Sequence, residues 1–352
     1  MASIEFKNIG KTFGSQKIIE NLNLTIKDGS FTVLVGASGC GKTTLLRMIA
    51  GIGPNTAGRI LMDGRDITGL DPGRRDIAMV FQNYAIYPTM TVRENIEFGL
   101  KNNRVPKKER DLLIQEVAET VNLAEYLNSK PGTLSGGQRQ RVALARAMVK
   151  KPKAFLMDEP LSNLDAKLRM QMRVELIELH EKLKTTFVYV THDQVEAMSM
   201  ADEIVLMDKG SICQVGSPEE IYNDPGSAFI AQFIGSPAMN ILDLPDGNKL
   251  GFRPEKAHLS KTASEAHFKK RGRIATREML GAETIYKVIM GEYPVMVKSM
   301  SDGFAAGDEA IVHVDAGHLY FFDRHGLRIH KSGEAAVQYA LSVAEELSDE
   351  QA

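Results

Sequence analysis

The stretch Gly36-Ala37-Ser38-Gly39-Cys40-Gly41-Lys42-Thr43 decides the fold of this chain of 352 residues. It fits the pattern G-x-x-x-x-G-K-[ST] and stands between an apolar, β-branched run, Phe31–Val35, and a helical run, Thr44–Ala50. In that context the glycines let backbone N–H groups turn onto phosphate oxygens, and the helix start adds positive potential. The stretch therefore predicts a strand, a phosphate loop and a helix within an α/β domain.

The loop residues have distinct predicted tasks. Lys42 is placed to reach the β- and γ-phosphates of a nucleotide, and the Thr43 hydroxyl is a candidate Mg²⁺ ligand. The predicted nucleotide contacts are Gly36, Ala37, Ser38, Gly39, Cys40, Gly41, Lys42, Thr43 and Thr44. The alternative is an ordinary strand-turn-helix without a ligand, and the pattern arises by chance only rarely in a chain of this length.

A second apolar run, Ala154–Met157, ends in two carboxylates, Asp158 and Glu159. Ligands of α/β sheets bind at the carboxyl ends of the strands, so we expect both acids beside the phosphate loop. Asp158 is a candidate Mg²⁺ ligand, and Glu159 is a candidate general base for the attacking water. The alternative, acids that merely end a strand, does not explain why the pair follows four apolar residues in a chain with a phosphate loop.

Composition excludes several classes of protein. Hydrophobic residues make up 43% and charged residues 25%, as in soluble folded proteins, and the length suggests about two domains. The net charge of −2 provides no overall field for nucleic acid or an anionic membrane. Two cysteines, Cys40 and Cys213, argue for a reducing compartment. Because we find no signal peptide and no apolar run near the ~20 residues that span a bilayer, we expect a cytoplasmic protein.

Residues 1–235 alternate short apolar runs with helical stretches, which predicts an α/β domain with a largely parallel sheet. The expected strands are Phe31–Val35, Ile77–Phe81, Ala154–Met157, Phe187–Thr191 and Glu203–Met207. The clearest helix is Ala166–Lys184, whose leucines and methionines recur at steps of three and four. A second helical stretch, Lys107–Tyr126, predicts a helical lobe over about residues 87–150.

Gly235-Ser236-Pro237 marks the predicted boundary to a second domain, residues 236–330, because glycine and proline disfavour a continued helix. Short strand-like runs separated by turn signals follow, which suits a small all-β barrel of the oligonucleotide/oligosaccharide-binding type. These runs are Thr284–Ile289, Val295–Lys298, Ala310–Val314 and Leu319–Phe322. Residues 331–352 form an acidic tail that could be a marginal helix.

Leu134-Ser135-Gly136-Gly137-Gln138 precedes another helical run, Val142–Val149. A serine hydroxyl and glycine N–H groups at a helix start make a second anion site, and one nucleotide does not need two such sites on one subunit. The segment resembles the signature of ATP-binding-cassette (ABC) ATPases. The resemblance implies a head-to-tail homodimer, in which Leu134, Ser135, Gly136, Gly137 and Gln138 of one subunit close over the ATP of the other.

Further positions match the ABC pattern and take their roles from the resemblance. It implies that Gln82 contacts Mg²⁺ and the attacking water and senses a membrane partner, and that His192 contacts the γ-phosphate. Phe13 matches the aromatic residue that stacks on adenine, and Asp165, in Ser162–Asp165, matches the loop that crosses the dimer interface. The resemblance thus implies a catalytic set of Glu159, His192 and Gln82, and a metal set of Thr43, Gln82 and Asp158.

The resemblance extends into the second domain through Phe233–Asn240, Gly251–Glu255 and Leu280–Glu283. These segments resemble the regulatory (TOBE) domain of ATPase subunits in maltose-type carbohydrate importers, including glycerol-phosphate relatives. The implied protein binds ATP and Mg²⁺ and lies peripherally on the cytoplasmic side of the inner membrane. It drives two permease subunits and, through them, serves an extracytoplasmic solute-binding protein. Asn83–Pro88, with two tyrosines expected to be exposed, is the implied permease contact.

A soluble cassette ATPase of DNA repair or of the ribosome is the alternative from another class. DNA-repair members insert a long coiled coil before the signature, whereas about 90 residues separate the two motifs here, and ribosomal members carry two cassettes. We therefore expect no nucleic-acid partner. The cargo does not follow from these residues, because the ATPase never touches it. A sugar is expected, and glycerol phosphate or another small polar solute is the alternative.

Overall fold

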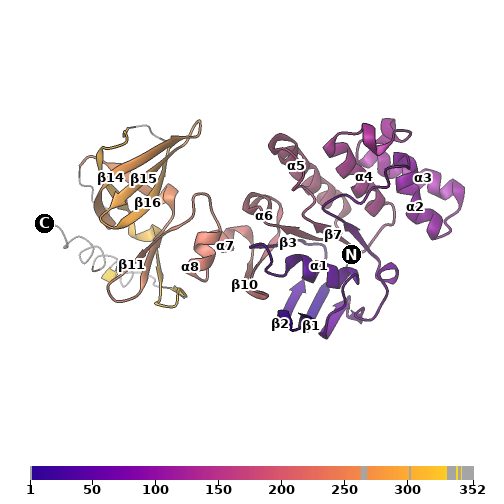
Figure 1. Ribbon diagram of the computed structural model, residues 1–352, viewed down its shortest axis with the longest axis horizontal. Helices are drawn as coiled ribbons and strands as arrows, with labels where there is room; N and C mark the ends of the chain where they lie inside the picture. The colour runs from indigo at the N-terminus through magenta and orange to yellow at the C-terminus, as the bar shows by residue number, and fades with distance from the viewer. Residues whose placement is uncertain (1, 263–267, 301–302, 331–337, 340–341, 343–352) are drawn as a thin grey trace. The chain divides into compact units, whose positions relative to one another are not determined.

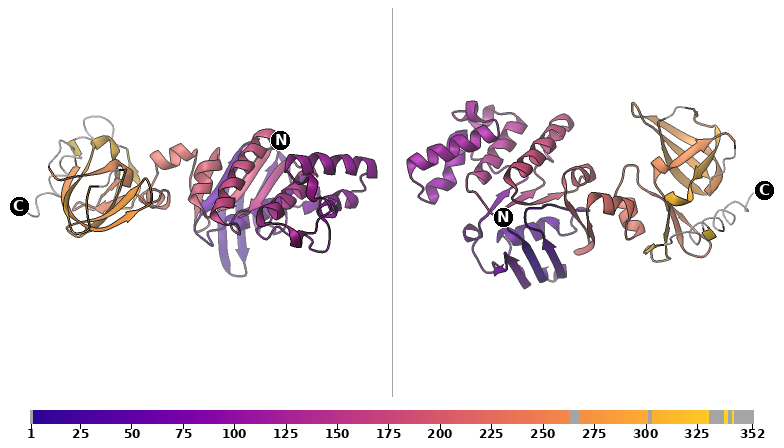
Figure 2. Two further views of the ribbon diagram at one scale, coloured as in Figure 1. Left: turned by 90° about the horizontal axis from the view of Figure 1, so that it is seen from above. Right: turned by 180° about the vertical axis from the view of Figure 1, so that it is seen from behind.

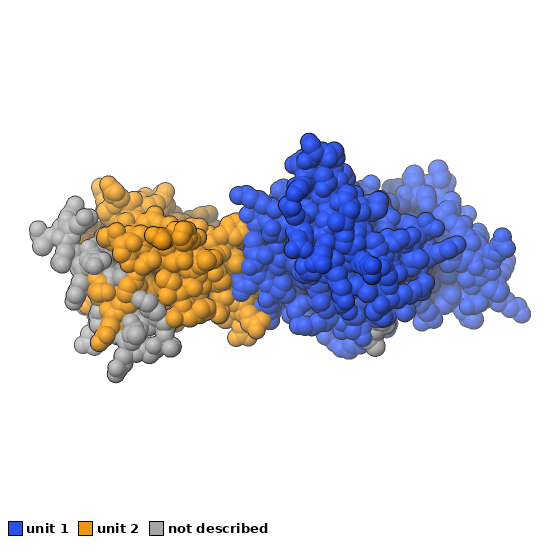
Figure 3. Space-filling model, turned by 90° about the horizontal axis from the view of Figure 1, so that it is seen from below, with its two compact units in different colours: residues 1–218 blue, residues 219–352 orange. Residues whose placement is uncertain are grey.

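The computed structural model describes residues 2–262, 268–300, 303–330, 338, 339 and 342. The chain forms two compact units, residues 1–218 and 219–352, which Figure 3 shows in different colours. The sequence predicts the boundary at residue 235. The two divisions differ by the segment 219–235, which contains most of α7 (Pro218–Asn223) and all of α8 (Ala228–Phe233).

The centre of the first unit is a six-stranded sheet with the order β10-β9-β3-β8-β7-β6. Five strands run parallel, and β10 pairs antiparallel with β9. The strands are β3 (Phe31–Gly36), β6 (Ile77–Val80), β7 (Ala154–Asp158), β8 (Thr186–Thr191), β9 (Glu203–Asp208) and β10 (Ser211–Gly216). The predicted parallel sheet is confirmed, and β3, β7 and β8 are buried along their whole length, as their continuous apolar runs require.

Different elements cover the two faces of this sheet (Figures 1 and 2). On one face, Phe31 and Phe187 pack their rings against His180 of α5 (Ala166–Leu183). On the other face, α1 (Lys42–Ala50) and an antiparallel sheet share one apolar core with Leu34 and Val188. The antiparallel sheet, which was not predicted, comprises β2 (Gln16–Ile26), β1 (Ile4–Phe13), β4 (Ala57–Met62) and β5 (Arg65–Asp66).

The predicted helical lobe contains α2 (Val92–Asn102), α3 (Lys107–Thr120) and α4 (Gly136–Met148). The helix α3 ends earlier than the predicted Tyr126, because the backbone turns left-handed at Asn122 (φ 54°). The last helix of the unit, α6 (Gln194–Met200), follows β8. Among the described residues we find no helix that is both long and apolar enough to cross a bilayer.

The second unit is built mainly from two antiparallel sheets, with the orders β11-β12-β18-β19 and β13-β17-β14-β15-β16. Its strands are β11 (Asn240–Asp243), β12 (Lys249–Phe252), β13 (Ala257–Ser260), β14 (Phe268–Met279), β15 (Thr284–Met290), β16 (Tyr293–Ser299), β17 (Glu309–Val314), β18 (Leu319–Phe322) and β19 (Arg328–Ile329). Both sheets contribute to one core that includes Phe252, Val288 and Phe321. The predicted all-β second domain is confirmed.

The side chain of Arg253 ties both short helices to the strands of the second unit. It is buried and donates hydrogen bonds to the backbone oxygens of Ala231 (3.0 Å), Ile234 and Tyr222 (2.7 Å). The guanidinium carbon also lies 4.0 Å from the centre of the Tyr222 ring. A buried guanidinium needs such acceptors, so these bonds hold α7 and α8 against the end of β12.

The acidic tail predicted for residues 331–352 lies outside the described residues, apart from 338, 339 and 342. The Tyr339 hydroxyl lies 3.1 Å from both Asp246 Oδ2 and Asn248 Nδ2, and its ring packs edge-on to Phe321. Among the described residues of the tail, Tyr339 therefore contacts β18 and the turn between β11 and β12.

Candidate functional site

The phosphate loop connects β3 to α1 by a turn that requires glycine. At Gly36, φ is +155°, and a Cβ there would lie 2.1 Å from the Met207 oxygen of the neighbouring strand β9. Gly41 (φ 108°) is the N-cap of α1, which begins at Lys42. The loop therefore presents the free N–H groups of a helix start, the arrangement that favours a phosphate.

Lys42 lies buried inside this loop. Its Nζ donates hydrogen bonds to the backbone oxygens of Gly36 (2.7 Å) and Ala37 (2.9 Å) and lies 3.7 Å from Cys40 Sγ. It is the one charged side chain in the quoted loop stretch. The loop is thus wrapped around a single positive charge.

Two of the predicted metal ligands lie in contact. The Thr43 hydroxyl donates to Asp158 Oδ1 over 2.9 Å, and Arg47 Nη2 lies 3.9 Å from the other carboxylate oxygen. Burial raises the pKa of Asp158, whereas the Thr43 hydrogen bond and the charge of Arg47 lower it. A cation beside this carboxylate would favour its charged form.

Glu159 and His192 meet at the ends of two neighbouring strands. In the parallel register, Asp158 of β7 pairs with Val190 of β8, and the Glu159 N–H donates to the Val190 oxygen over 3.0 Å. Glu159 itself adopts left-handed backbone (φ 46°). Its Oε2 lies 3.1 Å from His192 Nδ1, and the His192 side chain is 57% exposed. The two predicted catalytic side chains therefore form one pair that is open to a ligand.

The segment Ser162–Asp165, called the dimer loop below, is bonded to Glu159 and to Gln82. Ser162 Oγ donates to the Glu159 oxygen (2.9 Å) and accepts from Gln82 Nε2 (3.2 Å). Asn163 Nδ2 donates to the Gln82 oxygen (2.9 Å). Asp165 caps α5 by accepting from the Leu168 N–H (3.0 Å). The structure thus joins three separately predicted segments.

The signature segment starts α4. Ser135 and Gln138 form a reciprocal capping box: Ser135 Oγ accepts from the Gln138 N–H, and Gln138 Oε1 accepts from the Ser135 N–H. A Cβ on Gly137 would lie 2.9 Å from Leu168 Cδ1, so the helix start packs closely on α5. Within the described part of the chain, none of the hydrogen bonds joins this segment to the phosphate loop of the same chain.

Phe13, the predicted adenine contact, lies at the end of β1 with 55% of its surface exposed. The Nζ atom of Lys11 lies 4.6 Å from the centre of its ring. The ring is therefore available for stacking on a base. Sequence reasoning did not identify Lys11, because one lysine in a strand carries no motif.

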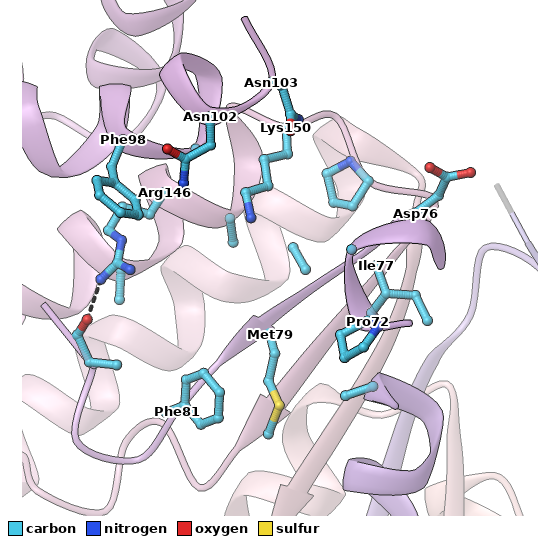
Figure 4. A pocket seen from close by; sticks show the side chains of 18 of the residues that line it. Pro72, Asp76, Ile77, Met79, Phe81, Phe98, Asn102, Asn103, Arg146 and Lys150 are labelled. Atoms are coloured by element: carbon cyan, nitrogen blue, oxygen red, sulfur yellow. Dashed lines mark hydrogen bonds between the residues drawn. The ribbon is translucent and has the colours of Figure 1, made fainter. Parts of the chain in front are cut away.

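A cavity of about 630 Å³ lies where β6, α2 and the end of α4 approach one another (Figure 4). Its lining is partly apolar, with Met79, Phe81 and Phe98, and it also contains Arg146 and Lys150. Sequence reasoning identified only the neighbouring segment Asn83–Pro88, because no motif marks the helix faces that complete the cavity.

The expectation that both tyrosines of this segment are exposed is wrong for Tyr84. Tyr84 is 9% exposed and Tyr87 is 37% exposed. Tyr84 and Ala85 both adopt left-handed backbone (φ 63° and 48°), so the segment turns here and the first ring is buried. Arg146 donates to the Ala85 oxygen, and its guanidinium carbon lies 4.9 Å from the centre of the Tyr87 ring.

Known proteins resemble the chain over nearly its whole length. A family model described as "ABC transporter" matches residues 19–162, and one described as "TOBE domain" matches residues 250–322. An sn-glycerol-3-phosphate import ATP-binding protein, UgpC, of Rhizobium meliloti (strain 1021) is 48% identical over 94% of this chain and 100% of its own length. The maltose/maltodextrin import ATP-binding protein MalK of Mannheimia succiniciproducens is 43% identical, over 93% and 97%.

The fold of the first unit also resembles that of a solved ABC transporter protein. The protein cbiO1 from Clostridium perfringens, part of the ABC transporter complex cbiONQ, superimposes with a TM-score of 0.57 at 26% identity. The match covers 62% of this chain and 89% of that one. The chain therefore belongs to the ABC transporter family, as an ATPase subunit with a C-terminal TOBE domain.

Proposed function

We propose that this chain is the energy-coupling subunit of an importer for a sugar or sugar-like solute, and that it works as a homodimer. The observation that carries the proposal is the gathering of Lys42, the Thr43–Asp158 contact and the Glu159–His192 pair at the carboxyl ends of β3, β7 and β8. Full-length similarity to import ATP-binding proteins supports the transport role.

In this proposal the phosphates of ATP lie on the backbone N–H groups of residues 36–44. The Lys42 ammonium already points into the loop, held by two carbonyl oxygens. Negative phosphate oxygens are stronger partners for an ammonium than carbonyl oxygens are, so the lysine would exchange partners when ATP binds. The exposed ring of Phe13 would stack on the adenine.

The chemistry of the donors fits Mg²⁺. The Thr43 hydroxyl and the buried Asp158 carboxylate lie 2.9 Å apart, and Mg²⁺ prefers oxygen ligands. We propose that these two residues and Gln82 hold the ion. When bound, it would neutralise charge on the β- and γ-phosphates.

For hydrolysis we propose that Glu159 accepts a proton from water as the water oxygen attacks the γ-phosphorus and the bond to ADP breaks. His192 would donate a hydrogen bond to the γ-phosphate, and the 3.1 Å contact between the two side chains orients both. Gln82, bonded to the dimer loop, would position the same water.

We further propose that each ATP is shared between two subunits. The signature segment forms a helix start with free N–H groups and has no hydrogen bond to its own phosphate loop within the described residues. Leu134, Ser135, Gly136, Gly137 and Gln138 would therefore close over the partner's ATP, with Asp165 in the dimer loop at the interface. Closure on ATP binding and reopening after hydrolysis would drive transport.

Mixed dimers test the shared site. Lys42→Ala and Ser135→Arg should each be inactive alone, because both sites of such a homodimer carry a lesion. In a mixed dimer both lesions fall in one site and the other site is intact, so activity should return to roughly half of wild type if the sites act independently. The measurement is ATP hydrolysis by co-expressed, doubly tagged dimers, and thermal melting of each variant is the control.

Because turnover can require both sites at once, ATP-driven dimerisation is measured beside activity. The Glu159→Gln protein, which carries no other substitution, should sediment as a dimer with Mg-ATP. A protein that remains monomeric under these conditions contradicts the shared site.

The cavity beside Asn83–Pro88 is the proposed contact for the permease. Its apolar side chains, among them Phe81 and Phe98, and its basic residue Arg146 suit the end of a helix from a partner protein. We propose two permease subunits, an extracytoplasmic solute-binding protein that acts through them, and a peripheral place on the cytoplasmic side of the inner membrane. The ATPase domain would comprise residues 1–235, the regulatory domain 236–330, and the acidic tail 331–352.

Reconstitution with the permease and its binding protein tests the transport role and identifies the cargo. A sugar should stimulate ATP hydrolysis in proteoliposomes, because substrate binding outside promotes closure of the ATPase dimer inside. Stimulation by glycerol phosphate would instead identify the alternative cargo, the solute in the name of the similar protein UgpC. Stimulation by DNA or ribosomes, and by none of the solutes, would contradict the transport role.

A further inference from the structure

Arg169 stands in the first turns of α5 and contacts two loops of the candidate site. Its Nη2 donates to the Leu164 oxygen in the dimer loop over 3.1 Å, and its Nη1 lies 3.4 Å from Asp193 Oδ2, next to His192. The two nitrogens belong to one rigid, planar group. The guanidinium therefore links the dimer loop to the loop of His192.

The contact with Asp193 is not needed to start α6. Asp193 caps that helix with its other oxygen, Oδ1, which accepts from the N–H groups of Val195 (2.8 Å) and Glu196 (3.3 Å). Arg169 contacts the second oxygen, Oδ2, and thus adds a link between Asp193 and α5 that the helix cap itself does not require.

The opposite side of the His192 loop is anchored in the core. Glu196 Oε2 accepts hydrogen bonds from the hydroxyls of Tyr189 (2.8 Å) and Thr191 (2.7 Å), all three residues being buried. Thr191 Oγ1 in turn accepts from the Asp193 N–H (2.9 Å). One side of the loop is therefore held by buried bonds that resist movement, and the partly exposed Arg169–Asp193 pair is the weaker side.

The same helix start also touches the signature. The side chain of Leu168, the neighbour of Arg169, packs against Gly137: a Cβ on this glycine would lie 2.9 Å from Leu168 Cδ1. The start of α5 therefore contacts the signature through Leu168 and the loop of His192 through Arg169.

We propose that Arg169 is a positioning residue, which sets the Glu159–His192 pair for hydrolysis by tying the His192 loop to the dimer loop. The proposal rests on the proposed role of His192. It assigns Arg169 no contact with ATP. Removal of Arg169 should therefore lower kcat and leave the KM for ATP nearly unchanged.

The variants are Arg169→Met, which keeps the stem and removes both nitrogen contacts, and Arg169→Lys, which keeps the charge but has one nitrogen for two acceptors. Arg173→Met, one turn further along α5 with no ion-pair partner among the described residues, is the matched control. We expect Arg169→Met to lower kcat about 10-fold, because small misplacements of reacting groups are costly, and to shift KM less than about 2-fold. Arg169→Lys should fall between it and wild type, and the control should match wild type.

A double-mutant cycle with His192→Gln separates positioning from general stability. If Arg169 acts through His192, adding Arg169→Met to His192→Gln should change kcat less than about 2-fold. A full further loss in that background would overturn the proposal, as would wild-type kcat in Arg169→Lys and Arg169→Met. Wild-type turnover of His192→Gln would overturn the role of His192 and this proposal with it. Thermal melting is recorded for every variant, and Arg169→Lys carries the cycle if Arg169→Met does not fold.

Discussion

We expect the Glu159→Gln protein to bind Mg-ATP about as tightly as wild type and to hydrolyse it at least ~10²-fold more slowly. The amide has the shape of the carboxylate but cannot accept a proton at neutral pH. The contact with His192 Nδ1, 3.1 Å in wild type, can be kept by the amide, so the geometry of the pair should survive. The loss should therefore fall on the proton-transfer step.

The trapped state gives the second measurement. With hydrolysis blocked, ATP stays bound, and the variant should accumulate as an ATP-bound dimer in sedimentation experiments. Glu178→Gln, the same change at an exposed position of α5, is the matched control and should turn over normally. Wild-type turnover by Glu159→Gln would show that another group accepts the proton and would remove Glu159 from the catalytic set.

The central sheet was predictable because its strands carry their own signal. β3, β7 and β8 are buried on both faces, so each appears as an unbroken apolar run. The antiparallel sheet was not predictable in this way. In β1 the alternation of buried and exposed residues is interrupted where its register with β2 shifts, between Phe6 and Thr12. The pairing of β1 with β4 joins Ile4 to Met62, a separation that no local pattern reveals.

The strand β14 (Phe268–Met279) was not among the strands predicted from the sequence, because its residues also lack a continuous apolar run. Its solvent-facing positions Lys269, Arg271 and Arg273 are basic, so the segment contains no apolar run of the kind that marks the buried strands. The buried positions Phe268 and Ile274 face the core, but with Gly272 between them the apolar alternation is weak.

The sequence predicts which residues form the site, but it does not predict which of their side chains contact one another. Motifs and parallel strands place Thr43, Asp158, Glu159 and His192 at one edge of the sheet, and the structure adds which of them touch. Arg169 could not have been found from the sequence. It lies inside a regular helix, and its partner Asp193 is 24 residues away along the chain.

We expect the loss of the Lys42 ammonium to weaken ATP binding and to slow hydrolysis even more strongly. Lys42→Ala removes the only charge in the phosphate loop, so ATP affinity should fall about 10- to 100-fold, the cost of a hydrogen bond to a charged group. Hydrolysis should fall about 10²- to 10³-fold, because charge that develops on the γ-phosphate loses the Lys42 ammonium as a donor. Equilibrium binding of ATP and steady-state hydrolysis measure the two effects separately.

The structure adds a complication that decides the choice of variants. Lys42 is buried and donates to the oxygens of Gly36 and Ala37, so truncation to alanine removes both hydrogen bonds and also leaves a void where the side chain packed, although the Ala37 oxygen keeps the Cys40 N–H (3.3 Å). Lys42→Met keeps the packed stem and removes the ammonium with its two hydrogen bonds, and Lys108→Ala, at an exposed position of α3, controls for the loss of a lysine elsewhere. If both Lys42 variants melt like wild type and only they lose ATP affinity, the loss of the ammonium group is responsible. Undiminished ATP binding by a folded Lys42→Met protein would mean that the nucleotide binds away from this loop, because no other cation of the stretch could replace the ammonium.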